Sequence, residues 1–303
     1  MAISVKDVYK IYGEQKALNG VSFEIKSGEV IGFLGPNGAG KSTMMKIITC
    51  YLPATSGTVR VNGIDVNENP EEVKKHVGYL PESNPLYFDM YVKEYLEYVA
   101  GVYGVKNKSA RVKEMVDLTG LNPEQHKKIG ALSKGYKQRV GIAQAMIHNP
   151  SVLILDEPTS GLDPNQLVDI RNLITEIGKE KTVMLSTHIM QEAEAMCNRI
   201  LIINKGNLVA DQATSEIKKT VSKNEIILIE FDKEVNVNEL KSMSGVIRVE
   251  KQKPNSYAIE AKESADVRAS LFKYAVDKGL TILTIAKNDT SLEDVFRNLT
   301  GKK

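Results

Sequence analysis

The feature that most constrains the fold is an apolar run that leads into a glycine-rich loop and then into a helix. Residues 29–52 read EVIGFLGPNGAGKSTMMKIITCYL, and the loop matches the pattern G-x-x-x-x-G-K-[ST] at Gly35, Gly40, Lys41 and Ser42. A buried strand, such a loop and a helix in this order form a βα unit. The sequence therefore predicts an α/β fold.

This loop has the composition of a phosphate cradle. Glycines allow the backbone N–H groups to converge on phosphate oxygens, and the helix adds the positive end of its dipole. Lys41 supplies a charge for the β- and γ-phosphates, and the Ser42 hydroxyl can ligate Mg²⁺. The pattern predicts a nucleoside triphosphate site rather than a chance glycine turn, without distinguishing a kinase, a GTPase or a motor. The predicted nucleotide-binding residues of the loop are Asn37, Gly38, Ala39, Gly40, Lys41, Ser42 and Thr43.

The segment SVLILDEPTSGLDP places two carboxylates directly after a second buried strand. Val152 to Leu155 form a continuous apolar run, which is typical of a central parallel strand buried on both faces. Asp156 lies at the carboxyl end of this strand, where α/β sheets bind their ligands, and can hold the water shell of Mg²⁺. Glu157 can polarise an attacking water, although adjacent carboxylates at a strand end can also be solvated caps.

A third strand, TVMLSTH, ends at His188. An imidazole at the ligand edge of the sheet can reach a γ-phosphate oxygen. The alternative is a structural histidine, which is the usual role of a histidine in isolation. Because the end of this strand should lie beside the other two, we favour a role for His188 in the site.

Bulk composition excludes other classes. The chain has 303 residues, enough for a large domain and a small one, and its net charge of +2 offers no reason to expect nucleic acid as a partner. The two cysteines, Cys50 and Cys197, suit a reducing compartment, and Cys50 is expected to be a core thiol in an apolar helix. We expect neither an export signal nor a transmembrane span, because a spanning helix needs roughly 20 apolar residues.

Four motifs in this order, GPNGAGKST, LSKGYKQR, LILDEPTSGLD and STH, resemble those of the ATP-binding-cassette (ABC) ATPases. The resemblance covers residues 2 to about 218. It implies a P-loop α/β cassette that hydrolyses ATP with Mg²⁺ and carries an inserted helical subdomain at about residues 83–150. In such an ATPase Glu157 is expected to act as general base, and His188 with Lys41 to stabilise charge on the γ-phosphate.

The same resemblance assigns roles to residues outside the phosphate loop. It implies that the ring of Tyr12 stacks on the adenine. The family's glutamine loop aligns with VGYLPESNPLY, in which Glu82 replaces the usual glutamine. A carboxylate there can still ligate Mg²⁺, so the expected metal ligands are Ser42, Asp156 and Glu82.

A second anion site is indicated by ALSKGYKQRVGIAQA, where polar and basic residues precede a helical pattern. LSKGYKQR resembles the ABC signature loop, with Ser133 and Gly135 retained and Lys134 and Tyr136 as departures. In the family this loop caps the ATP of another cassette, and SGLD at residues 160–163 resembles the D-loop that crosses that interface. The resemblance therefore implies a second cassette, expected as a homodimer, with two ATP molecules between the cassettes and Ser133 and Gly135 on the neighbour's nucleotide.

The expected helical insert is rich in aromatic residues. Tyr91, Tyr95 and Tyr98 fall at helical spacing and should share one face. From the residues alone, a small aromatic core and a groove for a partner's helix are equally good interpretations. The resemblance favours the groove, because in ABC importers and exporters this subdomain receives the coupling helix of a separate membrane permease.

The chain is expected to divide into a cassette at residues 1–218 and an accessory domain at residues 222–303. The strand and helix order βαββαβ in the tail suggests a small α+β, ferredoxin-like domain, structural or dimer-stabilising rather than ligand-sensing. A final helix is predicted at residues 291–299, with Thr290 and Glu293 as its capping box.

This tail resembles the C-terminal domain of ABC export ATPases whose membrane subunit is a separate chain, and residues 77–96 look especially like the gliding-motility-associated members. That implies a bacterial cytoplasmic motor subunit, peripheral on the inner membrane. One alternative is a non-transport ABC ATPase that powers a membrane regulator of cell-surface machinery. A soluble cassette acting on ribosomes or DNA, or a small-molecule kinase, fits the motifs less well.

Overall fold

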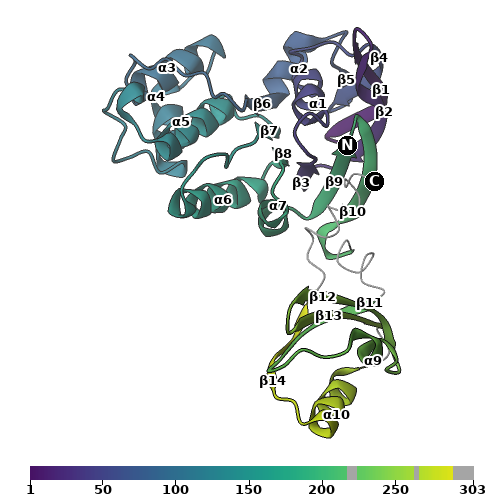
Figure 1. Cartoon of the computed structure of the whole chain (residues 1–303). Helices are drawn as coiled ribbons and strands as arrows, with labels where there is room; N and C mark the ends of the chain where they lie inside the picture. Colours follow the sequence, from purple (N-terminus) through teal and green to yellow (C-terminus); the bar gives the residue numbers. More distant parts are fainter. Residues whose placement is uncertain (217–223, 263–265, 289–303) are drawn as a thin grey trace. The chain divides into compact units, whose positions relative to one another are not determined.

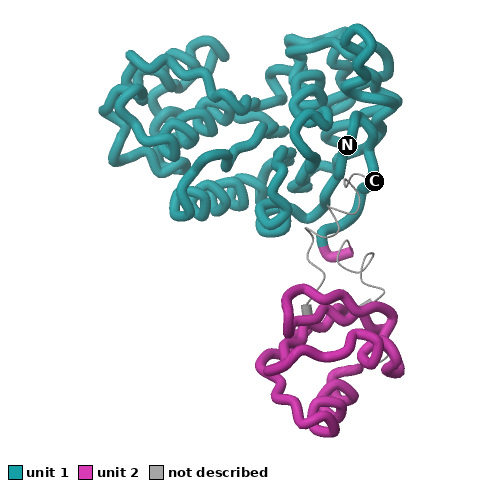
Figure 2. Tube along the Cα trace, in the orientation of Figure 1, with its two compact units in different colours: residues 1–214 teal, residues 215–303 magenta. Residues whose placement is uncertain are grey.

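The computed structural model describes residues 1–216, 224–262 and 266–288. The chain forms two compact units, Met1–Thr214 and Ser215–Lys303 (Figure 2). The division lies a few residues before the boundary at 218–222 that we expected from the sequence. Each unit has its own hydrophobic core and is described by itself.

The first unit is built around a six-stranded mixed sheet in the order β10-β9-β3-β8-β7-β6 (Figure 1). All neighbouring strands are parallel except β9 and β10. Every residue of β3, β7 and β8 is buried, so the prediction of central parallel strands from continuous apolar runs is confirmed. The strand bounds are Val30–Leu34 (β3), Val77–Leu80 (β6), Val152–Asp156 (β7), Thr182–Thr187 (β8), Arg199–Asn204 (β9) and Asn207–Ala213 (β10).

A second, antiparallel sheet in the order β2-β1-β4-β5 covers one face of the first. Phe23 of this sheet and Phe33 of β3 belong to one core cluster, and their ring centroids lie 5.8 Å apart. The cluster also contains the buried apolar side chains of α1, which contacts strands of both sheets. The strand bounds are Ile3–Tyr12 (β1), Gln15–Ile25 (β2), Ser56–Val61 (β4) and Ile64–Asp65 (β5).

Helices complete the first unit. Helices α6 and α7 contact strands of the large sheet. Helices α3, α4 and α5 contact one another and form an insert between β6 and β7, and α5 also contacts β6 (Figure 1). This is the helical subdomain that the sequence predicted at about residues 83–150. The helix bounds are Lys41–Ile48 (α1), Pro70–His76 (α2), Val92–Val102 (α3), Lys108–Leu118 (α4), Lys134–Met146 (α5), Pro164–Gly178 (α6) and Met190–Met196 (α7), with a 3₁₀ turn at Ile129–Ala131.

The second unit has the predicted order βαββαβ over its described residues. Its antiparallel sheet has the order β12-β13-β11-β14, and Phe231 and Tyr257 lie in a core shared with α9 and α10. The α+β class is confirmed, while the predicted final helix and its capping box lie outside the described residues. The bounds are Asn224–Phe231 (β11), Val237–Lys241 (α9), Val246–Lys253 (β12), Ser256–Lys262 (β13), Arg268–Lys278 (α10) and Ile282–Asn288 (β14).

Two local expectations are corrected by the structure. Cys50 is not a core thiol within a helix: it follows the end of α1, has a positive φ of 61° and is only half-buried. The three insert tyrosines do not share one environment. Tyr95 is buried and donates to Gln144 Oε1 at 2.6 Å, whereas Tyr91 and Tyr98 are about half exposed.

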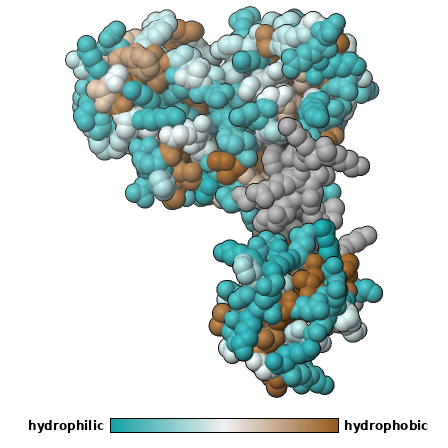
Figure 3. All heavy atoms as spheres, viewed as in Figure 1, coloured by the Kyte–Doolittle hydropathy of each residue, from teal (hydrophilic) through white to brown (hydrophobic). Residues whose placement is uncertain are grey.

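One tyrosine therefore serves the core and the others remain on the surface, and the groove for a partner's helix stays a prediction. Figure 3 shows hydrophobic side chains gathered over α3 on the same insert. Among the described residues, no helix combines the length and the apolar character required to cross a bilayer.

Candidate active site

Three adjacent strands of the large sheet end at the same edge. Strand β8 lies between β3 and β7 and is parallel to both, so their carboxyl ends meet there. The loop of residues 35–42 follows β3, Asp156 ends β7 and is followed by Glu157, and His188 follows β8. The expectation that the end of the histidine strand lies beside the other two is confirmed.

Glycines give the loop after β3 its shape. Gly40 has a φ of 113°, and a Cβ there would lie 2.5 Å from the Ala17 carbonyl oxygen. A Cβ on Gly35 would lie 2.4 Å from the backbone oxygen of Ile203. The backbone therefore curls into a path that side chains would block, and helix α1 begins directly after it at Lys41.

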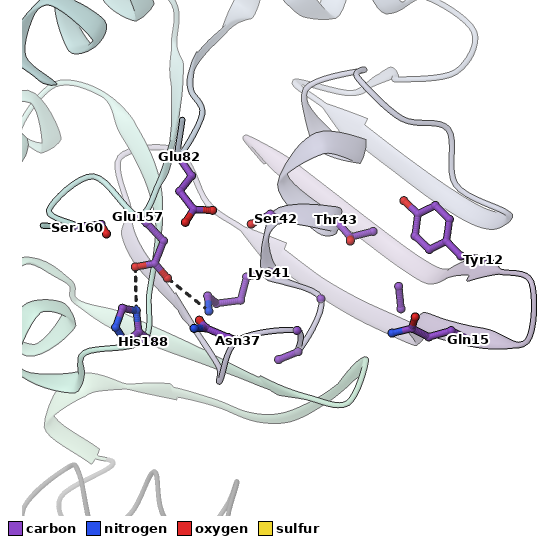
Figure 4. A pocket seen from close by; sticks show the side chains of 14 residues that line it. Tyr12, Gln15, Asn37, Lys41, Ser42, Thr43, Glu82, Glu157, Ser160 and His188 are labelled. Carbon is purple, nitrogen blue, oxygen red and sulfur yellow. Dashed lines mark hydrogen bonds and ion pairs between the residues drawn. The ribbon is translucent and has the colours of Figure 1, made fainter. Parts of the chain in front are cut away.

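Lys41 is buried and lies at the centre of the site. Its ammonium donates to the Gly35 carbonyl at 2.7 Å and lies 3.4 Å from Glu157 Oε1. The other oxygen of Glu157, Oε2, is 3.0 Å from His188 Nδ1 (Figure 4). One carboxylate thus joins the lysine of the first strand end to the histidine of the third.

The backbone around these carboxylates is held by Ser186 of β8. Its hydroxyl donates to Asp156 Oδ1 at 2.6 Å and accepts the N–H of Glu157 at 2.8 Å. Glu157 has a φ of 50°, a left-handed conformation that non-glycine residues seldom adopt and that surrounding contacts must maintain. The pKa of the neighbouring Tyr79 hydroxyl is raised, chiefly by burial and to a smaller extent by the negative charge of Asp156, so this hydroxyl stays protonated.

A cavity of about 490 Å³ opens over the loop. Its size falls in the range of small-molecule sites, roughly 300–1,000 Å³. Tyr12 lies at the opposite end of the cavity from Glu157 and His188 (Figure 4). The lining residues are Tyr12, Gln15, Ala17, Asn37, Gly38, Ala39, Gly40, Lys41, Ser42, Thr43, Glu82, Glu157, Ser160 and His188.

Every residue that we predicted for the loop is in this lining, whereas Gln15 and Ala17 were missed. No local pattern marks them, since β2 reaches the loop only through the tertiary fold. Tyr12 is 46% exposed, with Lys10 Nζ 5.1 Å from its ring centroid. Its ring is therefore free to take a planar base on its open face.

The three residues predicted to hold Mg²⁺ border one neighbouring cavity of about 430 Å³, to which Ser42, Glu82 and Asp156 all contribute. Figure 4 shows the Glu82 carboxyl group turned toward Ser42. In the parts of the chain that the structure describes, no cluster of three or more His, Cys, Asp or Glu side chains could hold a metal by itself. That arrangement fits Mg²⁺, which is usually bound by one or two carboxylates together with substrate phosphates.

The signature-loop residues Ser133 and Gly135 lie outside both of these cavities. Ser133 caps α5 by accepting the Tyr136 N–H at 3.3 Å, and a Cβ on Gly135 would lie 2.7 Å from Gln166 Cδ. Neither Ser133 nor Gly135 is among the residues that line the cavity over the phosphate loop of their own chain. Asp163 caps α6 by accepting the N–H groups of the two residues that follow Pro164.

These features define a P-loop nucleoside triphosphatase. The glycine loop carries a buried lysine, and one carboxylate contacts both that lysine and an imidazole, which are the groups that such an enzyme needs.

Comparison with known proteins narrows this class. Residues 18–160 match the family model described as ABC transporter, and residues 213–300 match the C-terminal domain of DrrA1-3-like ATP-binding proteins. The bacitracin transport ATP-binding protein BcrA of Bacillus licheniformis is 32% identical over 311 residues, covering 99% of this chain and 97% of that protein. The linearmycin resistance ATP-binding protein LnrL of Bacillus subtilis (strain 168) is 31% identical, covering 99% and 98%.

A solved structure is also similar. It is a dimeric ATP-binding cassette in a post-hydrolysis state bound to ADP and Pi, with a TM-score of 0.64, 29% identity, and coverage of 70% of this chain and 98% of that chain. The chain thus belongs to the ATP-binding subunits of ABC transporters, and it is an ATP hydrolase of that class. Its fold, an ABC cassette with an added small antiparallel domain, is the one predicted from the sequence.

Proposed function

We propose that the chain is the motor subunit of a bacterial exporter, in which two identical cassettes enclose two ATP molecules and drive a separate membrane permease. The observation that carries the hydrolytic part is the contact of Glu157 with both Lys41 and His188, at 3.4 and 3.0 Å. The export part is supported by relatives named for bacitracin transport and linearmycin resistance, similar along nearly the whole chain.

In the proposed reaction, Glu157 accepts a proton from the water that attacks the γ-phosphate. Lys41 leaves its contact with Glu157 and donates to phosphate oxygens, and His188 donates to the γ-phosphate from the third strand end. The buried setting of Lys41 and Glu157 strengthens these interactions relative to water. Tyr12 stacks on the base at the other end of the cavity.

Ser42, Asp156 and Glu82 are the residues proposed to hold Mg²⁺, which would neutralise charge on the β- and γ-phosphates. Asp156 is 1% exposed and accepts a hydrogen bond from Ser186, which fixes one carboxylate oxygen. Glu82 is exposed, so its carboxylate is free to turn toward a metal and differs by a full charge from the amide common in the family.

A second cassette is proposed because Ser133 and Gly135 lie outside the cavity of their own phosphate loop. They would cap the nucleotide of the other copy, and Ser160 and Asp163 would lie at the interface between copies. The dimeric relative with ADP and Pi supports this arrangement.

A docking surface for the permease is proposed where the insert meets the core. A cavity of about 440 Å³ lies there, lined by residues of the α1 end, β6 and α5, including Tyr51, Tyr79 and Tyr103. Exposed aromatic side chains of the insert, Tyr87 and Tyr98, lie beside one another with ring centroids 6.0 Å apart. A helix of a membrane subunit would fit such an aromatic surface, which would place the cassette peripherally on the inner membrane.

The test is to tag the Glu157→Gln variant in its native host, solubilise membranes gently and identify the proteins that co-purify. A multi-span permease supports the exporter. A single-span or cell-wall-regulating partner supports instead the alternative motor for cell-surface machinery. Recovery only with ribosomes or DNA contradicts both proposals.

The finer relation to gliding-motility-associated subunits rests on residues 77–96 and stays a prediction. The same experiment tests this relation, because a permease that co-purifies together with gliding machinery would support it. The relatives described above are named for bacitracin transport and linearmycin resistance, so they favour export of a small molecule.

A further inference from the structure

A buried carboxylate outside the proposed set of catalytic residues lies behind the site. Glu192, in the first turn of α7, is only 2% exposed. Its Oε2 atom accepts hydrogen bonds from Thr159 Oγ1 at 2.5 Å and from Thr187 Oγ1 at 2.9 Å. Within the described ranges, no lysine, arginine or histidine forms an ion pair with it. Two hydroxyl groups and the N-terminal end of the helix therefore carry its stabilisation.

Thr159 lies in the turn after β7 and Thr187 is the last residue of β8, so each is close in sequence to one proposed catalytic residue. Thr159 lies two residues after Glu157, and Thr187 immediately precedes His188. The Thr187 hydroxyl oxygen also accepts the N–H of Ile189 at 3.0 Å, so the backbone on both sides of His188 is held. One carboxylate oxygen thus joins the chain segments that present the general base and the histidine.

The backbone at Glu157, the proposed general base, requires contacts that hold it in place. Glu157 has a positive φ of 50°, and strained conformations persist only where surrounding contacts fix them. Ser186 holds its N–H on one side at 2.8 Å, and Glu192 holds Thr159 on the other. Loss of either contact allows the loop to relax away from His188.

We infer that Glu192 is a positioning residue for hydrolysis, which keeps Glu157 and His188 in contact by joining the loops that carry them. The inference rests on the proposed roles of Glu157 and His188. An apolar residue at this position would leave two buried hydroxyl groups without an acceptor and would leave the loops unconnected. An amide oxygen in the same place can accept from both hydroxyls.

The test uses the full-length chain and measures steady-state ATP turnover together with ATP affinity and thermal unfolding. Glu192→Ala is expected to lower kcat by about 10²-fold, the cost of a misplacement of about 1 Å, with KM for ATP unchanged within about threefold. Thr159→Val should lower kcat about tenfold, and Glu192→Gln should retain most of the turnover. The double variant Glu192→Ala with Thr159→Val should lose no more kcat than Glu192→Ala alone, because Glu192→Ala already removes the contact that Thr159→Val would break.

Thr119→Val is the matched control. Thr119 is fully buried, and its hydroxyl donates to the Met115 carbonyl at 2.6 Å in the helical insert, away from the site. It should lower the melting temperature as Thr159→Val does while leaving kcat intact. If Glu192→Ala does not fold, Thr159→Val carries the test.

Wild-type kcat in Thr159→Val, or an equal kcat loss in Thr119→Val, overturns the inference. If Glu157→Gln and His188→Ala still abolish turnover in that case, the proposed function stands without it. If those two variants also turn over normally, the proposed catalytic roles themselves are wrong.

Discussion

Replacing Glu157 by glutamine should separate two roles that we propose for this carboxylate. As general base it should contribute about 10²–10⁴-fold to turnover, or roughly 3–5 kcal/mol of barrier. As the ion-pair partner of Lys41 it competes with the nucleotide, because the ammonium must turn from Glu157 to the phosphates. Glu157→Gln should therefore nearly abolish turnover and at the same time strengthen ATP binding.

The size of the second effect follows from the contact distance. At 3.4 Å, with an effective dielectric constant of about 20, the gross attraction between the two charges is about 5 kcal/mol. Desolvation of both buried groups offsets most of this gain. We expect a net strengthening of about tenfold in ATP affinity, which corresponds to about 1.4 kcal/mol.

Phosphate release and equilibrium titration with ATP measure the two effects on the same purified variant. Glu176→Gln, which neutralises an exposed carboxylate of α6, is the control and should change neither. Turnover near that of the unmutated chain would remove Glu157 from the role of base. Unchanged or weaker ATP binding would refute the competition for Lys41.

Three further predictions test other parts of the structure. Gly78→Ala should lower the free energy of unfolding by about 1–3 kcal/mol, because a Cβ there would lie 2.2 Å from a carbonyl oxygen of α5. Thermal unfolding should show no comparable loss for Gly101→Ala in α3, where the nearest atom is the flexible end of the Lys108 side chain. Tyr12→Ala should weaken ATP binding by the 1–3 kcal/mol typical of base stacking, about 5–150-fold, and Tyr12→Phe should not weaken it. Equal ATP affinity of the unmutated chain and both variants would exclude stacking. Burial lowers the pKa of His148 below its usual 6.5, so the contribution of His148 to stability should be full above pH 6.5 and be lost as the pH falls through the folded-state pKa. In a series of thermal unfolding measurements at different pH values, His148→Gln should flatten this dependence of stability on pH, and His126→Gln, at an exposed position, should not.

Much of the fold could be predicted because its signals are local. The glycine loop and the continuous apolar runs before Asp156 and His188 each occupy adjacent positions, and the structure places each as expected. The βαββαβ order of the second unit follows from the same kind of pattern. The insert helices were predicted as a group, but spacing alone did not reveal that Tyr95 turns into the core while Tyr98 stays outside.

Parts of the site could not be predicted because no residue near them in sequence marks them. Gln15 enters the cavity from a strand of the second sheet. Glu192 looks like an ordinary polar residue of a short helix until Thr159 and Thr187 are brought against it. Cys50 sits in an apolar pattern, yet the helix ends before it and the backbone turns there.

The sequence by itself determined which chemical groups stand at the ends of the strands: a phosphate loop with a lysine, a pair of carboxylates and a histidine. Only the tertiary structure decided that these strand ends are neighbours, because the order β3-β8-β7 is set by burial of whole sheet faces and not by any short stretch of chain. That order brings Lys41 and His188 to the two oxygens of Glu157. Local periodicity specifies each element, whereas the contacts that make a site depend on packing between elements far apart in the sequence.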